Sequence, residues 1–269
     1  MKDLERKATE IRIEVLKMIM QASAGHIGGA FSSIDILTAL YYGEMNVDPK
    51  NPECEDRDRF ILSKGHIVEA LWAILADKGF IEKEELKTFS QFGTRLIGHP
   101  NNKVAGVEMN TGSLGHGLSV ATGIALAAKL DKKLYRAYTL MGDGELAEGS
   151  IWEAAMFAAH YQLDNLVAII DRNGLQISGE TEEVMGLESL SAKWKSFGWE
   201  VVEVNGHDMK QLIEVLSQTP LMSGKPTIII ANTIKTKGIL FAENVASWHH
   251  HVPTEEQYEL ALSELEVMI

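Results

Sequence analysis

The chain is poor in cysteine and in basic residues, and each shortage excludes a class of protein. Cys54 is the only cysteine among 269 residues, so the chain has no intrachain disulfide and no cysteine zinc site. Lysine and arginine number 25 against 38 aspartates and glutamates, which gives a formal net charge of -13. That charge argues against a general nucleic-acid or anionic-membrane surface. We therefore expect no nucleic-acid partner.

Long apolar runs are also missing. None approaches the roughly 18 residues of a membrane span, so no membrane association is expected. The first twenty residues carry Asp3, Glu5, Glu10 and Glu14, a composition that is wrong for a signal or transit peptide. With the lone cysteine, this favours a cytoplasmic protein. The apolar residues of the same segment fall at helical spacing and predict an amphipathic helix.

Three common nucleotide and hydrolase motifs do not occur. The sequence contains neither the P-loop pattern G-x-x-x-x-G-K-[ST] nor the dinucleotide fingerprint G-x-G-x-x-G. The nucleophile elbow G-x-S-x-G is absent as well. Any phosphate binding must therefore use another device.

What is present is an alternation of strands and helices. Strands are expected at 137–141, 166–171, 199–204 and 226–231, with helices at 118–130, 151–161 and 209–218. A further helix begins at Thr254, where Thr254 and Gln257 have capping-box spacing. It ends in an apolar turn, which either joins the core or touches a partner. The alternation predicts an α/β fold with a parallel sheet flanked by helices. We expect residues 1–269 to form a single domain.

Two polar side chains follow neighbouring strands of this sheet. Asp143, within Gly142-Asp143-Gly144, ends the first strand, and Asn173 ends the second. Adjacent strands lie about 4.8 Å apart, and Mg²⁺ spans about 4 Å between opposed ligands, so both oxygens can share one metal. Either motif alone is typical of a tight turn. Together, at the end of the sheet where α/β folds bind ligands, they favour a metal–diphosphate site.

Histidines flanked by glycine form a second pattern. They occur at His26, His66, His99 and His116, and a run of three follows Trp248. Histidine in a glycine loop serves well as a proton donor or acceptor near neutral pH, although each one alone could be a surface loop residue. None has the short spacing of a helical zinc pair, so a zinc site is not expected.

These motifs together resemble the thiamine-diphosphate motif of the transketolase family. The matching segments are Ser23-Ala24-Gly25-His26, Asp58 to His66, Thr111 to Gly117, Gly142 to Gly149 and Asn173. They occur in the family's order over nearly the whole chain. Two positions depart from the family's usual residues, Ile27 for proline and His116 for glutamine, and neither removes a group that the chemistry needs.

The resemblance implies a role for each matching residue. Magnesium would be held by Asp143, Asn173 and the backbone carbonyl of Leu175. Thiamine diphosphate would be contacted by His66, Gly112, Ser113, Leu114, Gly144, Glu148, Asn173 and His249. Catalytic proton transfers would fall to His26, His66, His99 and His249, with His249 chosen from the run 249–251 because it follows Trp248. Glu148 and Glu153 would link two cofactor sites across a subunit interface, although Glu153 could equally be a solvated helix residue.

The resemblance is to the amino-terminal part of a transketolase. A full-length member continues with a pyrimidine-binding domain, which supplies the glutamate that activates the cofactor. The chain is therefore expected to be the amino-terminal subunit of a two-chain enzyme, paired with a carboxyl-terminal subunit in a heterotetramer. The implied reaction is transfer of a two-carbon ketol unit between sugars or sugar phosphates.

Three alternatives stay open. The chain could belong to another thiamine-diphosphate enzyme, such as a deoxyxylulose-phosphate synthase or a dehydrogenase component. It could be a non-catalytic half that binds cofactor and regulates a partner. A Mg²⁺-dependent phosphatase using Asp143 is disfavoured, because Asn173 stands where a second carboxylate would be needed.

Overall fold

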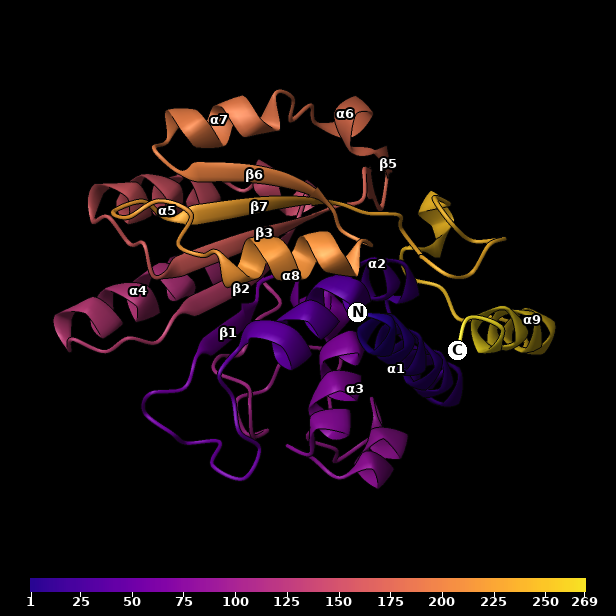
Figure 1. Cartoon of the computed structure of the whole chain (residues 1–269). Helices are drawn as coiled ribbons and strands as arrows, with labels where there is room; N and C mark the ends of the chain where they lie inside the picture. The colour runs from indigo at the N-terminus through magenta and orange to yellow at the C-terminus, as the bar shows by residue number, and fades with distance from the viewer.

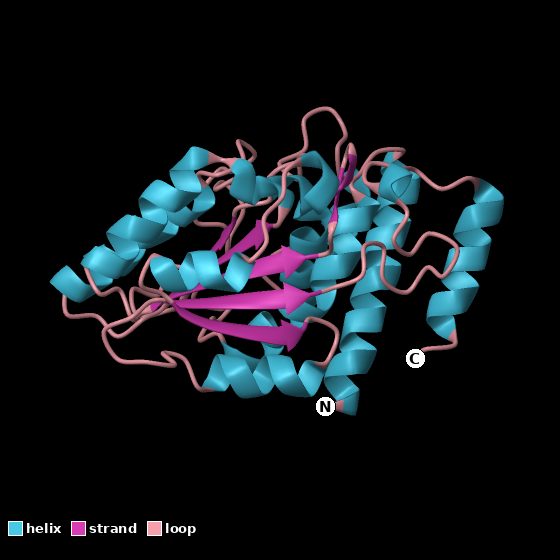
Figure 2. Cartoon of the chain, turned by 90° about the horizontal axis from the view of Figure 1, so that it is seen from above, coloured by secondary structure: helices cyan, strands magenta, loops and turns pink.

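A five-stranded sheet forms the centre of the molecule. The computed structural model describes residues 1–269, and all five strands are parallel in the order β1-β2-β3-β7-β6. The strands are β1 (Arg59–Leu62), β2 (Ala137–Gly142), β3 (Leu166–Arg172), β6 (Glu200–Asn205) and β7 (Thr227–Asn232). Figure 2 shows their arrows running in the same sense. The expected α/β fold is confirmed.

Helices cover both faces of this sheet (Figure 1). The helices are α1 (Lys2–Ala22), α2 (Ile27–Thr38), α3 (Val68–Lys78), α4 (Gly117–Leu130), α5 (Gly149–His160), α6 (Thr181–Val184), α7 (Leu190–Ser196), α8 (Met209–Ser217) and α9 (Glu255–Glu266). One layer contains α1, α2, α3 and α8, and the other contains α4, α5 and α7. None of these helices has the length and apolar character needed to cross a membrane.

The alternation of side chains along β3 explains why both layers are needed. Val167 and Ile169 pack into the cluster formed with α1, α2 and α3. Leu166, Ala168 and Ile170 pack into the opposite cluster, with α4, α5 and α7. Successive residues of a strand point to opposite faces, so a continuous apolar run buries both.

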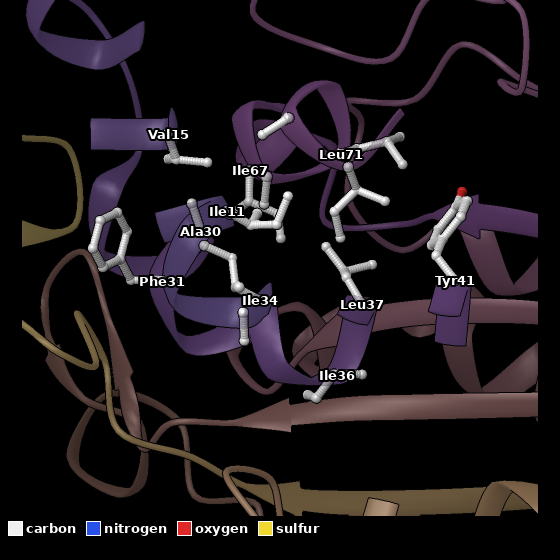
Figure 3. Close-up of a cluster of buried hydrophobic side chains, with 14 of the residues drawn as sticks. Ile11, Val15, Ala30, Phe31, Ile34, Ile36, Leu37, Tyr41, Ile67 and Leu71 are labelled. Carbon is white, nitrogen blue, oxygen red and sulfur yellow. The ribbon is translucent and has the colours of Figure 1, made fainter. Parts of the chain in front are cut away.

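Helix α2 is enclosed on all sides. Every residue from Ile27 to Thr38 is buried, and the helix lies between the sheet and helices α1 and α3. Figure 3 shows the packing of Ile34 and Leu37 on α2 against Ile11 on α1 and Leu71 on α3. Because α2 cannot shift without disturbing this core, the residues at its start and along its sheet-facing side have fixed positions.

The four expected strands are confirmed within one residue at each end, and the structure adds three more. Strand β1 has only four residues, so its periodicity is too short to identify from the sequence. The other two, β4 (Leu175–Gln176) and β5 (Gly179–Glu180), form a small antiparallel hairpin directly after β3. Strands β4 and β5 lie beside the expected metal site.

The chain ends differ in how they are covered. In α1, Ala8, Ile11, Val15 and Met18 are buried, as their spacing predicted. The capping box that begins α9 is present in both directions. The apolar last turn does not join the core, since Val267 is 88% exposed.

Candidate active site

A cavity of about 430 Å³ opens at the carboxyl edge of the sheet. This volume falls within the usual range for a small-molecule or cofactor site. The lining residues are His26, Gly29, Lys64, His66, Gly112, Leu114, Gly142, Asp143, Gly144, Glu145, Asn173, Leu175, Gln176, Ile177, Ser178, Lys235 and His249. His26 and Gly29 come from the start of α2, and the others come from the end of β2 or from segments that follow β1, β2, β3 and β7. The register places Gly142 beside Asp171, so Asp143 and Asn173 both leave the sheet just beyond its last paired residues.

Three oxygen-bearing groups in the cavity form the set expected for a metal. Asp143 is 2% exposed, and its Oδ2 accepts from the Gly174 amide at 2.7 Å and from Arg172 at 3.1 Å. Burial, and then the neighbouring charge of Asp171, raises the pKa of Asp143. Asn173 Oδ1 accepts only from the Leu175 amide, at 3.1 Å. Carboxylate, amide and carbonyl oxygens are hard ligands of the kind that Mg²⁺ prefers.

Two buried lysines line the same cavity. Lys235 Nζ lies 3.3 Å from the Leu175 carbonyl oxygen and 3.1 Å from His249 Nδ1. Burial, reinforced by the charge of Lys64, lowers the pKa of Lys235 to about 8. Lys64 pairs with Asp171. An anion in this cavity would offset the repulsion between the two ammonium groups, and a diphosphate has the charge to do so.

Three imidazoles of the site lie close together. The ring centroids lie 5.1 Å apart for His26 and His66, 5.7 Å for His26 and His249, and 5.4 Å for His66 and His249. Burial is the largest cause that lowers their pKa values, to about 4 for His26, 2 for His66 and 3 for His249, and nearby positive groups lower them further. All three rings are neutral near pH 7, so each has one ring nitrogen that donates a hydrogen bond and one that accepts.

The tautomer of His249 follows from its neighbour. An ammonium group donates hydrogen bonds and cannot accept them. Lys235 therefore donates to Nδ1 of His249, at 3.1 Å. The neutral ring carries its proton on Nε2, which leaves an N–H donor for another group.

Two glycines allow the close approaches that shape the site. Gly25 has φ +154°, and a Cβ there would lie 2.8 Å from Oε1 of Glu69. That same oxygen accepts the backbone N–H of His26 at 2.9 Å, so Glu69 fastens the loop that carries His26. Gly112 has φ +151°, and a Cβ there would lie 2.8 Å from Cδ2 of His99. His99 therefore packs at the rim of the cavity although it does not line it.

The structure brings together most of the residues that the sequence singled out. His26, His66, Gly112, Leu114, Asp143, Gly144, Asn173, Leu175 and His249 line the cavity. His99, Ser113, Glu148 and Glu153 do not. The backbone amide of Gly144 donates to Asp143 Oδ1 at 2.8 Å. Glu153 instead lies on a groove between α4 and α5 with Ser119 and Phe157. The assigned roles of all these residues remain predictions.

The three consecutive histidines have different surroundings. His249 lines the main cavity. His250 lines only an outer hollow, with its ring 4.6 Å from that of His26. His251 packs against Trp248, with ring centroids 4.2 Å apart. Of the three, His249 alone lines the main cavity, and its place beside a cofactor stays a prediction.

Sequence reasoning missed Lys64, Glu145 and Lys235. Glu145 is buried and accepts from the amides of Gly115 at 2.8 Å and Gly142 at 3.0 Å, as well as from Ser63. It ties together the ends of β1 and β2 and the loop before α4. Lys64 and Glu145 stood inside the motifs without an assigned role. Lys235 follows β7, and its position after a strand was the available signal.

The residues present fit a divalent cation together with a diphosphate. Asn173 Oδ1 has one hydrogen-bond partner, and the Leu175 carbonyl, which accepts from Lys235, has a second lone pair. Lys235 and Lys64 supply positive charge. Neutral imidazoles line the same cavity and offer hydrogen-bond donors and acceptors to a bound group.

Comparison with known proteins identifies the family. Residues 4–261 match the model of the transketolase, thiamine diphosphate binding domain. The solved transketolase from Campylobacter jejuni superimposes with a TM-score of 0.93 at 33% identity, covering 99% of this chain and 43% of that one. The chain belongs to the transketolase family, as the motifs predicted.

Relatives of matching length are named as transketolase subunits. One, an apulose-4-phosphate transketolase subunit of Phocaeicola vulgatus, is 52% identical over 97% of this chain and 93% of its own length. A 6-deoxy-6-sulfo-D-fructose transketolase subunit of a Clostridium species is 44% identical over 98% of this chain and 96% of its own length. Human transketolase is 39% identical, but the chain spans only 39% of that protein's length.

Proposed function

We propose that this chain is the amino-terminal, diphosphate-binding subunit of a two-chain transketolase that uses thiamine diphosphate and Mg²⁺. The observation that carries the proposal is one cavity lined by Asp143, Asn173 and Leu175 together with three neutral imidazoles. The enzyme would transfer a two-carbon ketol unit from a ketose or ketose phosphate to an aldose or aldose phosphate. Residues 1–269 would form one domain, in the cytoplasm.

Each group of the cavity has a part in this reaction. Asp143, Asn173 and the Leu175 carbonyl would hold Mg²⁺, whose charge would help to bind the diphosphate. Lys64 and Lys235 would offset the remaining negative charge. Thiamine diphosphate, when bound, supplies the chemistry that accepts and releases electrons as the carbon–carbon bond breaks and forms.

The histidines would move protons on the sugar. His249 presents an Nε2–H donor because Lys235 holds its other nitrogen. His26 and His66 are neutral, and the negative charge of a bound diphosphate would raise their lowered pKa values toward the range in which they could exchange protons with a hydroxyl. His99, at the rim, would act on the part of the sugar that enters last.

The names of two relatives suggest the substrate class. One is named for apulose-4-phosphate and the other for 6-deoxy-6-sulfo-D-fructose, and each name describes a ketose with a terminal anion. We propose a donor of that kind for this chain. The outer hollow lined by His26, Ser247, His249 and His250 is where the distant end of such a sugar would enter.

A second subunit completes the proposed enzyme. The relatives' subunit names, and the additional length of the single-chain transketolases, support a partner that supplies the pyrimidine-binding domain. Two chains of each kind would form a heterotetramer.

The test is ketol transfer measured with the chain alone and with a co-expressed partner subunit. We expect activity only in the mixture, with thiamine diphosphate and Mg²⁺ present. Asp143→Ala should abolish it, because a metal ligand is lost. Asp131→Ala, which makes the same change at an exposed position, should not.

High activity of the isolated chain would contradict the two-chain proposal. A stable complex that binds cofactor without transferring ketol units would favour a regulatory half. Reaction with pyruvate, but not with ketose donors, would favour a synthase-like enzyme.

A further inference from the structure

Asp171 is the most enclosed charged group beside the cavity, although it does not line it. Its side chain has no exposed surface, and it is the last residue of β3 paired with β2. Oδ2 accepts from Ser32 Oγ at 2.7 Å, from Ser33 Oγ at 3.1 Å and from Lys64 Nζ. Oδ1 accepts from Thr233 Oγ1. Every partner donates, so Asp171 acts purely as an acceptor.

A further donor to Asp171 is the side chain of Asn173. Nδ2 of Asn173 lies 3.1 Å from Asp171 Oδ2. The other end of the amide, Oδ1, accepts from the Leu175 backbone N–H at 3.1 Å. A flipped amide would set its oxygen against a carboxylate and its NH₂ against an N–H. Both contacts therefore select one orientation.

This orientation decides whether Asn173 can bind a metal. Only the amide oxygen is a ligand for Mg²⁺, and the NH₂ group is not. Asn173 is 8% exposed, so few other partners compete for its amide. Groups that orient a metal's direct ligands commonly change metal affinity by about tenfold or more.

We propose that Asp171 is a positioning residue that fixes the Asn173 amide with its oxygen toward the metal. This inference rests on the proposed function, which places Mg²⁺ at Asp143 and Asn173. The hydroxyls of Ser32 and Ser33 come from the enclosed helix α2, and Lys64 follows β1. The amide is therefore held by the core of the protein rather than by the metal.

The test compares two replacements of Asp171 in a Lys64→Met background. Lys64→Met/Asp171→Asn keeps an oxygen that can accept from Asn173 Nδ2, whereas Lys64→Met/Asp171→Leu removes it. Both variants lack the buried ion pair, and such a pair can often be replaced by apolar residues without loss of the fold. Ser32 and Ser33 keep a partner in both, because each hydroxyl lies within hydrogen-bond distance of the Gly29 carbonyl and can turn its single hydrogen to it.

The measurement is Mn²⁺ affinity in the two-subunit complex with thiamine diphosphate, from the electron paramagnetic resonance signal of free Mn²⁺. We expect the Leu variant to bind Mn²⁺ about tenfold more weakly than the Asn variant. Circular dichroism and thermal unfolding establish that both are folded. Equal affinities in two folded variants would overturn the positioning role alone. Failure of the unchanged complex to bind Mn²⁺ would overturn this inference and the proposed function together.

A measurement on the unchanged protein covers the case in which the Leu variant does not fold. Asparagine labelled with ¹³C and ¹⁵N reports both ends of the Asn173 side chain by NMR. Addition of Mg²⁺ should move the Cγ resonance, while the Nδ2 protons stay hydrogen-bonded and protected from exchange. Nδ2 protons that lose their protection when Mg²⁺ binds would overturn the inference.

Discussion

Each end of the sheet holds a buried aspartate, and the two aspartates accept hydrogen bonds from different kinds of donor. At the amino end, Asp58 accepts from the backbone amides of Asn46 at 2.9 Å and Arg136 at 2.8 Å. At the carboxyl end, Asp171 accepts from side chains alone. The first satisfies loop backbone that would otherwise be unpaired. The second orders side chains around a cavity, so one end supports the fold and the other supports a site.

The largest expected effect separates the two ends directly. Asp143→Asn should weaken thiamine diphosphate binding by roughly 1000-fold, or about 4 kcal/mol, because a direct ligand matters more than a group that orients one. Its free energy of unfolding should fall by about 2 kcal/mol, because the new NH₂ group must face the backbone N–H of Gly144 or that of Gly174. Cofactor titration and denaturant unfolding measure the two quantities.

Asp58→Asn should destabilise the fold to a similar extent but leave the site unchanged. Its NH₂ group must face one of two backbone N–H groups, which costs about 2 kcal/mol of stability. Cofactor affinity should be unchanged. A large loss of cofactor affinity in this variant would break the distinction between the two ends.

Glu69 extends the comparison to a buried acidic residue that has a hydrogen-bond partner on only one of its two carboxyl oxygens. Oε1 accepts from the His26 amide, and Oε2 has no partner. Burial raises the pKa of Glu69 to about 7 from its ordinary value of 4.5. The folded state therefore holds this proton more tightly than the unfolded state, and the stability it contributes is lost as pH rises from about 4.5 through 7.

Glu69→Gln keeps the acceptor for the His26 amide and removes the titration. Relative to the wild type, its stability should rise with pH across that window by up to about 3 kcal/mol, then level off. Urea unfolding at several pH values measures this, with Glu214→Gln, at an exposed position of α8, as the control. A difference that does not vary with pH would show that Glu69 is not protonated in the folded state.

The smallest expected effect lies away from both ends of the sheet. Thr254→Ala removes the side-chain cap of α9 and should cost about 1 kcal/mol, measured by thermal unfolding. Thr254→Ser keeps the hydroxyl and serves as the matched control. Neither change should alter cofactor affinity. An effect on the cofactor would mean that α9 is coupled to the site.

The sequence predicted the parts of this molecule that have strong local signals. The long apolar runs of β2 and β3 predicted the sheet. Asp143 and Asn173 were identified because each follows one of these runs. Strand β1 was missed because four residues are too few for periodicity. Lys235 was missed because a single lysine normally indicates a solvated surface, and only the fold shows that it is 1% exposed.

The run from His249 to His251 illustrates a different limit. Three identical residues in sequence carry no information about which one faces inward. The separation into a cavity residue, a rim residue and one packed on Trp248 comes from the short helical turn at Ala246–Trp248 and the packing that follows it. Tertiary context supplies what residue type cannot.

The register between β2 and β3 has a consequence for how this chain can tolerate changes in length. Gly142 lies opposite Asp171, and the two expected metal ligands sit just beyond that pair. Inserted residues at the amino end of the sheet, as in the loop at 48–57, leave this alignment intact. Deletion of one residue within β2 or β3 would turn each following side chain to the other face of the sheet. Natural variation in length should therefore accumulate at one edge of the molecule and be nearly absent from the strands that lead to the other.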